Sequence, residues 1–158
     1  MSVMVGASRA RAGAPAVWHH GSRATVFVTV VDVVVQLLLG RTMAEAVAEN
    51  RILPDLVAHR RRLVMALLAR LPAELDLVKA RIEEYLHTGS AGIPVEVHAI
   101  MLVGALVMTG AGVRDPALVT SSLVSQVRDR GWLNSVKLVN AVLRRMSDEL
   151  GLAARPRE

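Results

Sequence analysis

The chain has 158 residues, a formal net charge of +5, and a composition that is 53% hydrophobic and 21% charged. This length predicts one domain with a sizeable core, and this composition excludes a chain that is disordered throughout. Because cysteine is absent, disulfides, thiolate metal sites, iron–sulfur clusters and cysteine nucleophiles are excluded. With two Trp, one Tyr and one Phe, the chain is not expected to carry an aromatic platform for stacking RNA bases.

The start of the chain predicts a flexible basic arm over residues 1–23. This stretch is rich in Ala, Gly, Ser and Arg, contains no acid and shows no apolar period. The apolar run at 24–39 resembles the core of a signal peptide, but it contains Asp32 and is shorter than the roughly 20 residues of a membrane span. We therefore interpret it as a buried helix, with Asp32 at its edge or paired with an arginine, and we expect a cytoplasmic protein.

Helical signals continue in chain order to residue 150. Thr42 and Glu45 have the spacing of a capping box, and proline favours the first turn of a helix. No stretch has the alternating pattern of a strand, so we predict an all-α fold, a single compact bundle of about seven helices over residues 24–150, followed by a short tail at 151–158. The expected helices cover 24–39 and 43–50, open at Pro54 and at Pro72, cover 94–109, open at Asp115-Pro116 and cover 134–150.

One helix is expected to lie at the centre of the bundle. Between Pro94 and Thr109 the ionisable residues are Glu96 and His98, so the helix is apolar on all sides. It is too short to cross a bilayer. Gly104 would let a neighbouring helix approach its backbone closely.

The last predicted helix carries a recognisable motif. Residues 131–146, GWLNSVKLVNAVLRRM, resemble the C-terminal signature of NusB-type domains. Upstream, the segments 41–47 (RTMAEAV), 59–71 (HRRRLVMALLARL) and 93–108 (IPVEVHAIMLVGALVM) resemble helices of the family in the same order, the last two being most similar to the N-terminal helical domain of RsmB-type ribosomal RNA cytosine-5 methyltransferases. The resemblance covers roughly 24–150. It implies that these residues form a NusB-like helical domain, and it implies RNA binding in transcription antitermination or in rRNA processing or modification.

Methyltransferase activity itself is not expected. Those enzymes attack the pyrimidine ring with cysteine, which this chain lacks, and no strand–glycine loop–helix fingerprint of a cofactor domain is present before Glu158. We therefore predict a non-catalytic helical domain without a cofactor, while a decayed enzyme served by a separate catalytic subunit remains a weaker alternative. The histidines lack metal-ligand spacing and the serines lack a hydrolase motif, so no metal or nucleophile is expected.

Positive charge gathers at the two ends of the chain. Residues 1–40 carry a net +2, residues 41–113 are balanced and residues 114–158 carry +3. Together with the resemblance, this implies a surface that contacts RNA phosphates, although a solvated polar face is the alternative. Its expected residues are Arg9, Arg11, Arg23, Arg130, Lys137, Arg144 and Arg145.

The expected partner is ribosomal or leader RNA, and a protein partner or a second copy of the chain is a further option. The basic step at 59–62 is either a second phosphate contact or a helix turn facing water. An adaptor or homodimerising domain without an RNA role is the alternative function. It is favoured by the apolar excess and by Leu106 and Val107, which stand where the family often has Tyr-Glu.

Overall fold

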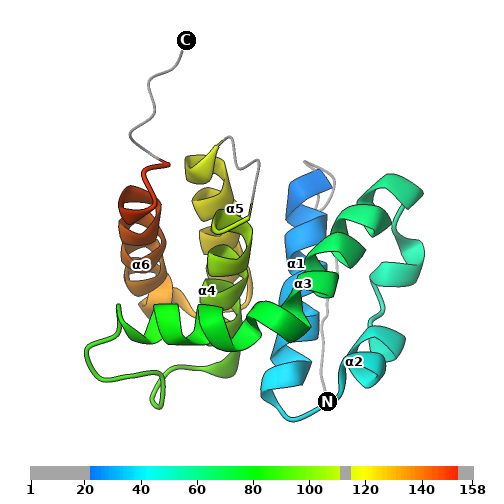
Figure 1. Cartoon of the computed structure of the whole chain (residues 1–158), viewed down its shortest axis with the longest axis horizontal. Helices are drawn as coiled ribbons and strands as arrows, with labels where there is room; N and C mark the ends of the chain where they lie inside the picture. The colour runs from blue at the N-terminus through cyan, green and yellow to red at the C-terminus, as the bar shows by residue number, and fades with distance from the viewer. Residues whose placement is uncertain (1–21, 111–114, 153–158) are drawn as a thin grey trace.

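Every regular element in the described part of the chain is a helix. The computed structural model describes residues 22–110 and 115–152. Its helices pack into one bundle (Figure 1), which confirms the predicted all-α fold. The elements are α1 (Ser22–Leu38), α2 (Met43–Glu49), the 3-10 turn η2 (Leu53–Asp55), α3 (Ala58–Glu83), α4 (Val95–Met108), α5 (Pro116–Asp129), the 3-10 turn η3 (Leu133–Ser135) and α6 (Val136–Glu149).

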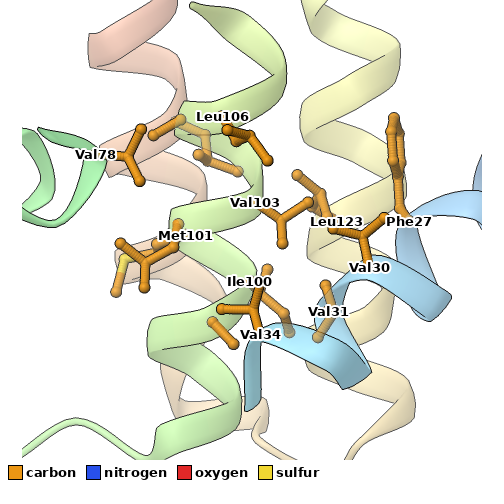
Figure 2. Packing of buried hydrophobic residues seen from close by; sticks show 14 of the residues in the cluster. Phe27, Val30, Val31, Val34, Val78, Ile100, Met101, Val103, Leu106 and Leu123 are labelled. Atoms are coloured by element: carbon orange, nitrogen blue, oxygen red, sulfur yellow. The ribbon is translucent and has the colours of Figure 1, made fainter. Parts of the chain in front are cut away.

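The centre of the bundle is α4, as the sequence predicted. This helix packs against α1, α3, α5 and α6, and every residue from Ala99 to Leu106 is buried. Figure 2 shows Ile100 pointing towards Val34 of α1, and Val103 lying near Leu123 of α5. A helix that is apolar on all sides can be stable in water only when neighbours cover it all round, which these four helices do.

Gly104 fixes how closely α6 and α5 approach α4. A Cβ atom added at this position would overlap Leu143 Cδ2 of α6 and would lie 3.3 Å from Leu123 Cδ1 of α5. The predicted close approach at Gly104 is therefore confirmed, and two branched side chains fill the space that a larger residue would need.

The start of α2 has the predicted capping box. The backbone N–H of Glu45 donates to Thr42 Oγ1 at 3.1 Å, and the backbone N–H of Thr42 donates to Glu45 Oε1 at 2.9 Å. These reciprocal bonds satisfy donors that the first turn of a helix leaves unpaired. The hydrogen bond from Thr42 also lowers the pKa of Glu45 below its usual value.

The prediction that a new helix opens at Pro72 is wrong. Pro72 lies inside α3, a continuous helix that bends along its length in Figure 1. The buried residues Leu68 and Leu71 before the proline, and Val78 and Ile82 after it, follow one helical stripe that packs on α1 and α4. This packing outweighs the lost backbone hydrogen bond, so the described residues contain six α-helices instead of about seven.

The structure also corrects the interpretation of Leu106 as a partner-facing residue. Leu106 has no exposed surface and belongs to the core cluster, while Val107 is half-buried against that cluster. Their apolar character therefore supports the fold of this chain. It carries no argument for a docking surface.

Candidate nucleic-acid interface

Lys137 and Arg144 form the free basic face of α6. The opposite face of the helix is anchored by Val139, Leu143 and Met146, none of which has exposed surface. Lys137 and Arg144 are both exposed, and seven residues, close to two helical turns, place them on the same outer side. Within the described residues neither side chain forms an ion pair, so both charges are available to an anion in solution.

Arg145 lies beside these two residues but has partners of its own. Its guanidinium stands 5.3 Å from the centre of the Tyr85 ring, and its Nε donates to Glu149 Oε2 at 3.2 Å. The Tyr85 hydroxyl donates to Glu149 Oε1 at 2.6 Å, which together with Arg145 lowers the pKa of the Glu149 carboxyl below its usual value. This cluster joins the end of α3 to the end of α6, and it offsets part of the charge of Arg145.

Arg130 has a mainly structural position. It caps the end of α5, and one guanidinium nitrogen donates to Asp32 Oδ1 of α1 at 2.7 Å while another donates to Glu96 Oε2 of α4 at 2.9 Å. The side chain is 17% exposed. Because its donors already serve two carboxylates, Arg130 is poorly placed to bind phosphate. The expected pairing of Asp32 with an arginine is confirmed.

The Arg130 network extends to an aromatic residue that the sequence did not single out. Trp132 Nε1 donates to Glu96 Oε1 at 2.8 Å, so the two oxygens of one carboxylate hold Trp132 and Arg130. Burial raises the pKa of Asp32 above its usual value despite the opposing effect of Arg130. No local pattern of residues indicated this network, because its members are brought together by the packing of three helices.

Of the three basic residues predicted for the N-terminal arm, the structure describes only the backbone of one. Arg9 and Arg11 lie outside the described residues, and for Arg23, in the first turn of α1, the backbone alone is described. Whether the two basic ends of the chain form one surface therefore stays a prediction.

Further cations lie at two places on the described surface. In the basic step at 59–62, Arg61 donates to the backbone oxygens of Leu56 at 2.8 Å and Pro54 at 3.2 Å, so it holds the turn before α3. Arg62 is exposed on the same helix. Arg128, in the last turn of α5, is exposed and forms no ion pair with another described residue.

No group of three or more potential metal-ligating side chains gathers among the described residues. None of the described helices is long and apolar enough to cross a membrane.

A comparison with known proteins covers both the helical bundle and α6. The sequence model of the NusB family matches residues 20–148, which include all of α1 to α5 and nearly all of α6 except its final residue. The searches of curated proteins and of solved structures gave no significant match. The family match does not distinguish the RsmB-type branch, and that closer likeness stays a prediction. A match over more than half of the chain, on an all-helical bundle, shows that the chain belongs to the NusB family.

Proposed function

We propose that this protein is a non-catalytic RNA-binding domain that contacts RNA phosphates through the outer face of α6. The observation that carries the proposal is the pair of exposed, unpaired cations Lys137 and Arg144 on the helix that holds the VNAVLRR element. This element is the part of the sequence that most resembles NusB-type domains. The resemblance to NusB-type domains implies contacts with RNA and with protein partners.

The proposed mechanism is electrostatic. Each cation that meets a phosphate releases condensed counterions from the RNA, and this release favours binding most at low salt. Lys137 and Arg144 supply the described part of the surface, and Arg128 near the start of α6 adds a third free charge. Arg145 contributes less because Glu149 shares its guanidinium. Arg130 is left out of the surface because two carboxylates occupy its donors.

The arm is proposed to add Arg9, Arg11 and Arg23 to the same RNA. The process would be transcription antitermination or the processing or modification of ribosomal RNA in the bacterial cytoplasm, with ribosomal or leader RNA as ligand. The resemblance to the helical domain of RsmB-type enzymes supports the rRNA version. A catalytic role is not part of the proposal, since no cysteine is available for the chemistry of those enzymes.

The test is fluorescence anisotropy of a labelled ribosomal RNA hairpin with the full chain, measured at several salt concentrations. For the double variant Lys137→Ala/Arg144→Ala we expect weaker binding at low salt. We also expect the slope of log K against log salt to become less steep by about 1.4–1.8, since each lost phosphate contact removes about 0.7 on a single-stranded loop and about 0.9 on a duplex stem.

A matched control is Arg51→Ala. Arg51 is an exposed arginine between α2 and η2 with no ion pair among the described residues, and its loss should leave the slope unchanged. Equal slopes for the α6 double variant and the wild-type chain would refute the proposed surface. Absence of salt-dependent binding to any RNA would refute the RNA-binding function and leave the adaptor as the better hypothesis.

A further inference from the structure

Among the described residues, Trp132 is the aromatic side chain that stands open to solvent. Trp132 is 37% exposed, whereas Phe27 and Tyr85 are 5% and 8% exposed. It directly precedes η3, which packs on both α5 and α6. An indole ring presents a large flat apolar area, so a ligand that covers it gains binding energy. The ring therefore stands beside the helix that carries the proposed basic face.

Hydrogen bonds hold Trp132 at its backbone and at its ring. Gly131 ends α5 in the left-handed region with φ +87°, where its N–H donates to the backbone oxygen of Arg128 at 2.9 Å. The backbone N–H of Trp132 then donates to the backbone oxygen of Val127 at 3.0 Å. The indole Nε1 donates to Glu96 Oε1 at 2.8 Å. A ring that is fixed in this way before binding loses little conformational entropy when a ligand covers it.

The charges near the ring separate a place for phosphate from a place for a neutral group. Arg128 lies four residues before Trp132 and Lys137 five residues after it; both are exposed, and neither forms an ion pair with another described residue. The carboxylate that holds the indole shares Arg130 with a second acid, so that cluster carries one excess negative charge. Phosphates are therefore attracted to the two free cations and repelled from the indole, where an uncharged base meets no such repulsion.

We propose that Trp132 stacks on one unpaired base of the bound RNA, while the neighbouring cations hold its phosphates. The inference rests on the RNA binding proposed above, and it names the form of the ligand as single-stranded RNA. In a duplex both faces of a base are covered by its neighbours, so a base must be unpaired to offer a face to the ring. Every base has such a face, so the contact selects single strands without selecting a sequence.

The first experiment is fluorescence anisotropy of a labelled single-stranded RNA with the full chain at several salt concentrations. Trp132→Ala should weaken binding by roughly tenfold at every salt concentration, which is within the range for the loss of one stacked base. The slope of log K against log salt should stay unchanged, because the substitution removes no charge. The double variant Lys137→Ala/Arg144→Ala changes that slope, so the two contributions are measured separately.

Three further variants separate stacking from other roles of the side chain. Trp132→Phe keeps an aromatic face but lacks the indole N–H, and it should retain most of the affinity. Trp132→Leu keeps an apolar side chain without an aromatic face, and it should bind as weakly as Trp132→Ala. Leu118→Ala removes a 44% exposed apolar side chain at the opposite end of α5 and should bind like the wild-type chain. Far-UV circular dichroism checks that each variant folds.

Tryptophan fluorescence tests the contact directly. The chain has two tryptophans, Trp18 and Trp132, so Trp18→Phe leaves Trp132 as the one source of this fluorescence. A base that stacks on an indole ring quenches its emission. Single-stranded RNA should therefore quench the Trp18→Phe chain on binding, while a fully paired duplex of the same sequence, bound through its phosphates, should leave the emission nearly unchanged.

Three outcomes would overturn stacking at Trp132 and leave the basic face of α6 in place, since the salt slope tests that face separately. They are wild-type affinity in Trp132→Ala or Trp132→Leu, binding of single-stranded RNA without quenching, and an equal loss in Trp132→Phe and Trp132→Ala. The last result would assign the effect to the hydrogen bond with Glu96. A wild-type chain that binds no RNA would overturn both this inference and the proposed function.

Discussion

The guanidinium of Arg130 forms ion pairs with two carboxylates. The guanidinium is the common partner of Asp32 and Glu96, so the cluster carries one uncompensated negative charge where α1, α4 and α5 meet. Removing the cation from such a cluster and removing one of its acids are expected to have different effects on stability. Loss of the cation leaves two half-buried carboxylates without a partner, while loss of one acid leaves a matched pair.

We expect Arg130→Met to lower the free energy of unfolding by about 2 kcal/mol, because both carboxylates lose their partner in a partly desolvated place. Asp32→Asn should cost clearly less, since Arg130 keeps Glu96 and since burial already raises the pKa of Asp32. Urea unfolding of the two variants measures the difference. Arg128→Ala, an exposed control near the same helix end, should change stability by less than about 0.5 kcal/mol. A larger loss in Asp32→Asn than in Arg130→Met would contradict this account.

His98 is expected to make stability depend on pH. Burial lowers the pKa of His98 below its ordinary value of 6.5, helped by Lys79 and opposed by Glu83, and its Nε2 has no partner among the described residues. The unfolded chain therefore binds the proton more tightly than the folded one. Stability should be fully present above pH 6.5 and should fall as the pH drops below that value.

The measurement is urea unfolding at pH 7.5 and at pH 5.5. His98→Gln should reduce the loss of stability between these two pH values, since a neutral side chain replaces the group that titrates. His59→Gln, at an exposed histidine near the start of α3, serves as the control and should keep the wild-type loss. An unchanged pH dependence in His98→Gln would show that another group is responsible.

At the scale of single elements, neighbouring residues in the sequence were sufficient to predict the structure where the interaction itself joins neighbouring residues. The capping box at Thr42 depends on two residues three positions apart, and the structure has both of its hydrogen bonds. Pro72 shows the limit of such signals. Its preference for a first turn is real, but the buried stripe on both sides of it is continuous, and packing on α1 and α4 decides the length of α3.

Gly104→Ala tests the contact between α4 and α6. Alanine would favour the helix by up to about 1 kcal/mol, but its Cβ must displace Leu143, which is fully buried. We expect a net loss of about 1–2 kcal/mol of unfolding free energy in thermal or urea denaturation. The double variant Gly104→Ala/Leu143→Val should lose less than the sum of the single variants, because the smaller valine makes room. Simple additivity would show that the two positions do not compete for the same space.

At the scale of the whole molecule, the sequence predicted the helical bundle and its central helix but only part of the candidate interface. Lys137 and Arg144 could be placed on one outer face because a single helical period relates them. The role of Arg130 could not be predicted in this way, because its partner Asp32 is 98 residues away and the two meet only after the bundle forms. The pairing of Asp32 with some arginine could be expected from its apolar surroundings, but not the identity of that arginine.

The position of α4 within the chain has a consequence for protein synthesis. Two of the four helices that cover it, α5 and α6, are translated after it. At 5–20 residues per second, the stretch from the end of α4 to the end of α6 takes roughly 2–8 s to make. During that interval an apolar helix stands uncovered on two sides of a growing chain. Because uncovered apolar surface favours aggregation, we expect ribosome-associated chaperones to bind the nascent chain until α6 emerges and docks.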